Sequence, residues 1–179
     1  MHHLKSGDLA PTFNTTDIYG NHITPFQDGK WTFLSFHRFA ACPFCVIRTN
    51  ELIQNVEKFS EHSINILSFW PSNRETMRRF SDDYQAPFPL ISDEKRKIYT
   101  KYGVTKSSKL AAFRLLLHPA LALKALKHKP KNEELEIDQA LLPCEFLVNP
   151  DGKIVLAHYG KHYGDHLTLA ALINLVKNA

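Results

Sequence analysis

Hydrophobic and polar positions along the chain follow two periods. The runs "WTFLSFH" (31–37) and "SINILSFW" (63–70) are short and apolar, which is typical of buried strands. Between them, in 43–59, apolar residues recur at helical spacing. Upstream, 7–26 predicts a short β-hairpin that turns at Tyr19-Gly20-Asn21. The first part of the chain is therefore predicted to run hairpin, strand, helix, strand.

The alternation continues further along the chain. Ser72, followed three residues later by Glu75, predicts a capped helix start. A short helix is expected over 94–103, and a second hairpin over 144–160 is followed by a closing helix over 165–178. Strands that alternate with helices favour an α/β fold with a central mixed sheet flanked by helices. We expect one domain over residues 1–179, because the chain is too short for two comfortable cores.

Residues 105–140 interrupt this rhythm as a helical insertion before the late hairpin. Apolar residues dominate 110–126, but Arg114, His118, Pro119 and Lys124 interrupt them, which excludes a bilayer span. Pro119 is expected to divide the insertion into two short helices. We expect a cap over the sheet or the active-site cleft, or a homodimer contact. A partner surface or a helix lying on a membrane is the alternative.

Charge and composition narrow the class of protein. The net charge of +4 is spread along 179 residues, which gives no reason to expect a nucleic-acid partner. Three cysteines do not make a disulfide framework, and the first residues lack the apolar core of a signal peptide. We therefore expect a cytoplasmic protein without a cofactor. In a reducing compartment a close cysteine pair is more often catalytic or metal-binding than structural.

Cys42 and Cys45 form such a pair, where the predicted strand gives way to the predicted helix. Unpaired N–H groups and the helix dipole favour a thiolate there, and Pro43 suits the first helical position. We expect Cys42 to be the exposed nucleophile and Cys45 the more buried resolving thiol. His37 and Arg38 could add positive potential, although an arginine near a strand end is usually only solvated.

Three stretches resemble the peroxiredoxin (alkyl hydroperoxide reductase/thiol-specific antioxidant, AhpC/TSA) family of the thioredoxin superfamily, and its CxxC-bearing members in particular. They are "GDLAPTF" (7–13), "FHRFAACPFC" (36–45) and "LLPCEFLVNPDGKIVLAHYGKHYGDH" (141–166). The resemblance implies a thioredoxin-like fold and an antioxidant oxidoreductase. It also implies that Pro143 is a cis-proline facing the CxxC, which shapes the groove where substrates dock.

The chain departs from the same family at two points. Peroxiredoxins carry Pro-x-x-x-Thr/Ser-x-x-Cys, but counting back from Cys42 gives Ser35 and Phe39, and counting from Cys45 does not fit either. Pro143 stands where these proteins carry an arginine at the start of the late strand. These departures favour thiol–disulfide exchange with protein or small-molecule partners over efficient peroxide reduction. The alternative is a thiol-dependent peroxidase acting on hydrogen peroxide or alkyl hydroperoxides and using an external thiol reductant.

A non-enzymatic alternative is a zinc-binding or redox-sensing module. Cys42, Cys45, Cys144 and a histidine could form a tetrahedral zinc site, but the sequence has no second paired knuckle. We therefore expect no metal. Cys144 is interpreted first as a buried small hydrophobe, and second as a third thiol close enough to trap the pair in another disulfide.

Overall fold

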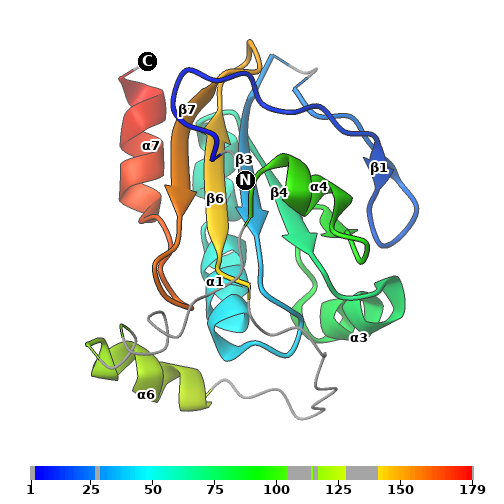
Figure 1. Ribbon diagram of the computed structural model, residues 1–179, viewed down its shortest axis with the longest axis vertical. Helices are drawn as coiled ribbons and strands as arrows, with labels where there is room; N and C mark the ends of the chain where they lie inside the picture. Colours follow the sequence, from blue (N-terminus) through cyan, green and yellow to red (C-terminus); the bar gives the residue numbers. More distant parts are fainter. Residues whose placement is uncertain (1–2, 27–28, 105–113, 115–116, 128–140, 179) are drawn as a thin grey trace.

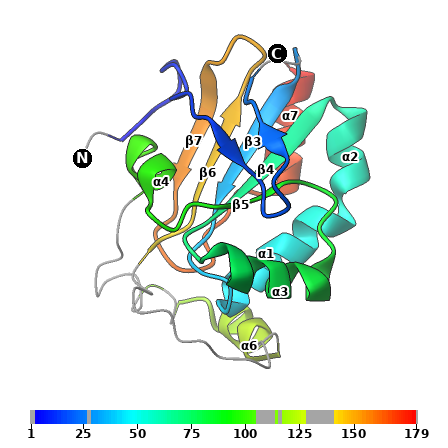
Figure 2. The same cartoon turned by 90° about the vertical axis from the view of Figure 1, so that its right-hand side faces the viewer.

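A five-stranded mixed sheet forms the centre of the protein, in the order β5-β4-β3-β6-β7. Figure 1 shows β4, β3, β6 and β7 side by side, and β5 is labelled in Figure 2. The computed structural model describes residues 3–26, 29–104, 114, 117–127 and 141–178. The strands are β3 (Trp31–Phe36), β4 (Ile64–Trp70), β5 (Leu90–Ser92), β6 (Cys144–Val148) and β7 (Ile154–Tyr159). β4 is parallel to β3 and β5, whereas β6 is antiparallel to both β3 and β7. This arrangement confirms the predicted α/β class.

A separate two-stranded hairpin precedes the sheet, as predicted. β1 (Thr15–Thr16) pairs antiparallel with β2 (His22–Ile23). The Asp17 carboxylate accepts hydrogen bonds from the backbone N–H groups of Tyr19 and Asn21, 2.9 and 2.8 Å long. This aspartate turn, with Gly20 at a positive φ, closes the hairpin.

Helices cover both faces of the sheet (Figure 2). α1 (Pro43–Gln54), α2 (Val56–Glu61) and α7 (Leu169–Lys177) lie on one face, and the short α4 (Lys97–Lys101) lies on the other. α3 (Arg74–Tyr84) adds buried side chains to the cluster under α1. Two hydrophobic clusters result, one on each face of the sheet. Burial of this apolar surface is the main force that stabilises the layers.

Two helix boundaries differ from the prediction. The expected helix over 43–59 is divided at Asn55, whose side-chain amide donates to the Glu51 carbonyl, 2.8 Å away, and competes with the regular backbone pattern. Asn73, not Ser72, caps α3 by accepting from the Thr76 N–H. The Ser72 hydroxyl instead accepts from the backbone N–H of Ala40, 2.9 Å away, and so fixes the loop that precedes α1.

The insertion contributes α6 (Pro119–Lys127), which starts at the proline as predicted. Ala125 is buried against the α1 cluster, and Leu121 packs there while half-buried. The first of the two expected helices, which precedes Pro119, falls largely outside the described residues. Within the part of the chain that is described, no helix is long and apolar enough to cross a membrane.

Candidate active site

The CxxC lies where the C-terminal end of β3 passes into α1. Cys42 is the N-cap of α1 with an extended backbone (φ −76°, ψ 118°), and Pro43 occupies the first helical position, as predicted. The Cys42 side chain makes no capping bond, whereas its carbonyl accepts from the Val46 N–H at 3.0 Å. The first N–H groups of α1 are therefore available to the Cys42 sulfur.

Both sulfurs of the pair are covered. Cys42 and Cys45 are each 0% exposed, so the expectation of an exposed Cys42 sulfur is wrong. The cause is the short loop between β3 and α1: Arg38, Phe39 and Ala40 fold over the helix start and are themselves buried. Cys45 is buried against the sheet as expected.

Arg38 is the residue that brings charge to this site. Its Nη1 donates to the Cys42 Sγ at 3.1 Å, and its backbone N–H donates to the Cys45 Sγ at 3.2 Å. Its Nε donates to the Leu141 carbonyl at 2.7 Å, and the side chain is almost fully buried. Sequence reasoning discounted Arg38 as a solvated residue. The local sequence does not show that Arg38 is buried, because its partner carbonyl at Leu141 is about a hundred residues away along the chain.

The two thiols have opposite acidities. Burial alone raises the pKa of Cys42, but the hydrogen bond from the Cys45 thiol, the Arg38 charge and the N–H groups of Cys45 and Phe44 outweigh it and lower the pKa to about 6. Burial, and the Cys42 thiolate beside it, raise the pKa of Cys45 well above its usual value. At neutral pH the pair therefore holds a thiolate at Cys42 and a proton on Cys45.

Tyr163 was not identified from the sequence. Its ring centroid lies 3.8 Å from the Arg38 Cζ, and the Phe39 ring lies 5.1 Å from the same atom. Tyr163 belongs to the loop between β7 and α7, more than a hundred residues from the CxxC. No local pattern could have connected it to Arg38.

Pro143 lies one residue before β6 and is buried. Its peptide bond is trans, because the described residues contain no cis peptide bond, so the expected cis-proline is wrong. Trans is the ordinary form of an X-Pro bond, and here the chain continues directly into β6 while the Pro143 carbonyl accepts from the Gly160 N–H at 2.9 Å.

Cys144 is separated from the pair by the sheet. It pairs in register with Phe36 of β3, and both belong to the cluster on the α4 face, whereas Cys42 and Cys45 belong to the cluster on the α1 face. Burial raises the pKa of Cys144 well above its usual value. This geometry agrees with a buried small hydrophobe. Among the described residues, no group of three or more His, Cys, Asp or Glu side chains could hold a metal ion.

A buried charged network lies next to the site on the α1 face. The Glu145 carboxylate accepts from the Arg48 Nε at 2.8 Å, from the Leu167 N–H at 2.7 Å and from the His166 Nδ1 at 3.0 Å. Burial opposes its ionisation, but the charges of Arg48 and His166 and these hydrogen bonds lower the pKa of Glu145 to about 2. The network ties β6 to α1 and to the start of α7.

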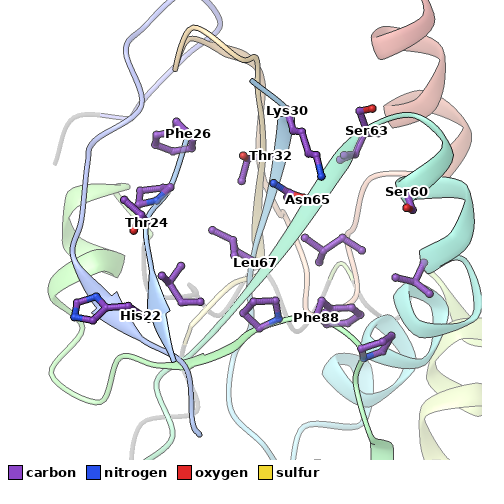
Figure 3. A pocket seen from close by; sticks show the side chains of 17 residues that line it. His22, Thr24, Phe26, Lys30, Thr32, Ser60, Ser63, Asn65, Leu67 and Phe88 are labelled. Atoms are coloured by element: carbon purple, nitrogen blue, oxygen red, sulfur yellow. The ribbon is translucent and has the colours of Figure 1, made fainter. Parts of the chain in front are cut away.

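The described residues also line two pockets to which neither Cys42 nor Cys45 contributes. One, of about 420 Å³, is lined by Phe44, Leu121 and Gly164 among others, between α1 and α6. The other, of about 440 Å³, is lined by residues at the starts of β3 and β4, whereas the CxxC follows the end of β3. Figure 3 shows its lining side chains, which include His22, Thr24, Phe26, Lys30, Thr32, Asn65, Leu67 and Phe88. Neither thiol of the CxxC lines this second pocket.

Known proteins with similar sequences and folds point to one family. Peroxiredoxin Bcp of Escherichia coli is 29% identical over 106 residues, covering 58% of this chain and 67% of the relative. Peroxiredoxin 6 of Arenicola marina, solved as a mutant, superposes with a TM-score of 0.71 at 17% identity, covering 97% of this chain and 72% of its own. The thioredoxin domain of a thiol-disulfide oxidoreductase from Bacteroides vulgatus superposes with a TM-score of 0.62 at 19% identity, covering 98% and 97%.

The structural likenesses establish a thioredoxin-like fold of the peroxiredoxin type. The sequence match extends further, because residues 6–157 match the AhpC/TSA family, which covers the hairpin, the CxxC and the late strand pair. This span includes the stretches 7–13 and 36–45 and the first part of the stretch 141–166, which carry the resemblance to this family. The chain is a member of the AhpC/TSA family of peroxiredoxin-like oxidoreductases.

Proposed function

We propose that this protein is a thiol-dependent peroxidase in which Cys42 is the peroxidatic thiol and Cys45 the resolving thiol. The observation that carries the proposal is the Arg38 guanidinium on the Cys42 sulfur, 3.1 Å away, with both groups buried. A guanidinium there supports the thiolate and also faces the oxygen that leaves when a peroxide bond breaks. Peroxiredoxins carry an arginine where this chain has Pro143. We propose that Arg38, from the loop before α1, takes the place of that arginine here.

The reaction proceeds in two balanced steps. The Cys42 thiolate attacks one peroxide oxygen, the O–O bond breaks, and a sulfenic acid forms while the departing alkoxide takes up a proton as an alcohol or water. The Cys45 thiol then attacks the sulfenic sulfur, and the Cys42–Cys45 disulfide forms with loss of water. An external dithiol reduces the disulfide by exchange and restores both thiols. Cys45 carries its own proton at neutral pH, which supplies the proton for the departing water.

Burial of both sulfurs favours a small oxidant. A folded protein disulfide must reach the attacking sulfur in line, whereas hydrogen peroxide or a short alkyl hydroperoxide needs little space. Pro143 and Gly160 are proposed to form one wall of the site, since their backbones are joined at 2.9 Å. A thiol couple of this kind depends on cellular reductants, which fits the expected cytoplasmic location.

Thiol–disulfide exchange is the second candidate function. One observation favours it: the CxxC occupies the first turn of α1, with a low-pKa Cys42 hydrogen-bonded by a protonated Cys45. In that arrangement Cys45 can release a mixed disulfide formed on Cys42. The two functions share both thiols and differ in the oxidant.

Stopped-flow tryptophan fluorescence distinguishes the two oxidants. Trp70 stacks on His37 with ring centroids 4.0 Å apart, directly beside the loop of the active site, and serves as the reporter. The reduced protein is mixed with hydrogen peroxide or ethyl hydroperoxide, and Cys42→Ser and Cys45→Ser variants are the controls. We expect oxidation at least about a hundredfold faster than that of a free small thiol, abolished in Cys42→Ser.

The Cys45→Ser variant tests the second step. It should react with peroxide once and retain a sulfenic acid on Cys42, which dimedone labels and mass spectrometry detects. Peroxide oxidation no faster than that of a free thiol, together with rapid reduction of a protein disulfide by the same preparation, would replace the peroxidase proposal with disulfide exchange.

A further inference from the structure

The loop between β7 and α7, residues 160–166, lies tightly against the active site. A Cβ on Gly160 would approach the Pro143 Cγ to 2.8 Å and the Pro143 carbonyl oxygen to 2.9 Å. A Cβ on Gly164 would approach the side chains of Leu121 and Phe44 to 2.7 and 2.9 Å. Glycine is needed at position 160, because a Cβ there would meet backbone oxygens, whereas at position 164 it would meet the ends of two side chains.

The same loop is fixed at both ends by polar contacts. The Asp165 carboxylate accepts from the Lys161 N–H at 2.8 Å and lies 3.3 Å from the His158 Nε2. Just beyond, the His166 Nδ1 lies 3.0 Å from the carboxylate of the buried Glu145. These contacts hold the loop in place, and one of the three side chains between its two glycines contacts Arg38.

That side chain is Tyr163, and it faces the guanidinium of Arg38. The Arg38 Cζ is 3.8 Å from the centre of the Tyr163 ring, a cation–π contact at short range. The Arg38 Nε donates to the Leu141 carbonyl at 2.7 Å, and its Nη1 donates to the Cys42 Sγ at 3.1 Å. The ring and the carbonyl together hold the guanidinium in the orientation that aims Nη1 at the sulfur.

We propose that Tyr163 is a positioning residue, whose ring holds the Arg38 guanidinium on the Cys42 sulfur and so sets the reactivity of that thiol. It does not touch the reacting sulfur and acts through Arg38. The inference rests on the proposed role of Cys42 as the nucleophile, but the contacts that carry it do not depend on which oxidant is used.

The ionisation of Cys42 gives a direct measure of this effect. Among the described residues, the titratable groups that act on Cys42 are Arg38 from the preceding loop and Cys45 from α1. The Cys45 and Cys144 thiols both have pKa values raised well above the usual range. Below about pH 9, thiolate absorbance at 240 nm therefore reports Cys42, with Cys42→Ser as the blank.

The test is a titration of the fully reduced protein at 240 nm, without peroxide or any other substrate. In Tyr163→Leu we expect the midpoint to rise by about one pH unit, because the loss of the cation–π contact frees the guanidinium to move. Tyr163→Phe keeps the ring and should leave the midpoint within about 0.3 pH unit of the original. Tyr163→Met provides a second variant without a ring and has the same expectation as leucine.

A double-variant cycle shows whether Tyr163 acts through Arg38. In an Arg38→Met background, Tyr163→Leu should cause no further rise, because the group that the ring holds is gone. If the titration midpoint of Cys42 is unchanged or lowered in Tyr163→Leu and Tyr163→Met, and both variants keep the native circular dichroism, the proposal is overturned. The Tyr163 ring would then only shield the site from solvent. A further rise in the Arg38→Met background would do the same. Failure of the peroxidase assay would not affect either titration.

Discussion

Replacing Arg38 by methionine removes the positive charge from the Cys42 sulfur while keeping the length of the side chain. The pKa of Cys42 is about 6, whereas the usual value is 9.0, so the interactions at the site lower it by about three pH units against the opposing effect of burial. A unit-charge pair about 4 Å apart at an effective dielectric constant of about 20 is worth at most about 4 kcal/mol, or about three pH units. The hydrogen bond from the Cys45 thiol lowers the pKa more than the Arg38 charge does, so the charge accounts for only part of the shift. The Cys45 hydrogen bond and the N–H groups of α1 stay in place.

We therefore expect Arg38→Met to raise the pKa of Cys42 by about two pH units, to about 8. At pH 7 the thiolate fraction would fall from about nine-tenths to about one-tenth. A thiolate of higher pKa is also a better nucleophile, by roughly six- to tenfold over two pH units. These two effects nearly cancel in an alkylation rate measured at pH 7, so the midpoint of the pH profile is the diagnostic quantity.

The assay is the pH titration of thiolate absorbance at 240 nm in the fully reduced protein, with Cys42→Ser as the blank, because it needs no reagent to reach the covered Cys42 sulfur. Arg38→Lys keeps the charge without the planar fork and should give an intermediate midpoint. Arg78→Met is the matched control, because Arg78 also donates to a backbone carbonyl, that of Ile18 at 3.0 Å, but lies away from the CxxC. A midpoint for Arg38→Met within about 0.3 pH unit of the original protein, with the fold intact, would refute the reasoning.

Two further predictions concern the surroundings of the pair. Glu145→Gln should destabilise the protein by about 3 kcal/mol near pH 7, because it leaves Arg48 buried without its main partner; urea unfolding measures this. Since the folded pKa of Glu145, about 2, is below its usual 4.5, its ionisation stabilises the fold fully above about pH 4.5, and this contribution is lost as the pH falls through about 2. The variant should lack that acid dependence, and an equal dependence in both proteins would contradict it. Cys144→Ala should leave peroxide oxidation of Cys42 within about twofold, since the sheet separates the two; a larger loss would show that Cys144 takes part.

The sheet could be predicted from local patterns because its strands are short apolar runs with clear boundaries. The run 31–37 yielded β3 almost to the residue, and the turn at Asn149–Gly152 defined the hairpin of β6 and β7. The predicted helix boundaries were wrong where a polar side chain forms a hydrogen bond to the backbone that the sequence pattern does not show. Asn55 interrupts a continuous apolar pattern, and Ser72 binds the loop before α1 rather than its own helix.

The candidate site was predictable only in its local part. Spacing alone placed Cys42 at the N-cap and Pro43 in the first turn of α1. Burial of the sulfur depends on Arg38 turning inward, and that depends on a carbonyl acceptor at Leu141 and an aromatic ring at Tyr163. Both partners are about a hundred residues or more away along the chain, so no local pattern contains the information.

Comparison with the family motif predicted weak peroxide reduction because it found no arginine at position 143. It did not consider Arg38, which lies in another part of the chain. Peroxiredoxins carry an arginine where this chain has Pro143. Pro143 is buried and uncharged, and its carbonyl accepts a hydrogen bond from the Gly160 N–H. The pKa of a thiol responds to the distance of a positive charge and not to the segment that supplies it. Arg38 brings that charge to 3.1 Å from the loop immediately before the cysteine. A guanidinium so close in sequence to the nucleophile depends on distant residues for its orientation, and Leu141 and Tyr163 meet that need. The positive charge beside Cys42 therefore comes from the loop before the CxxC, and the late segments hold the arginine in place through the Leu141 carbonyl and the Tyr163 ring.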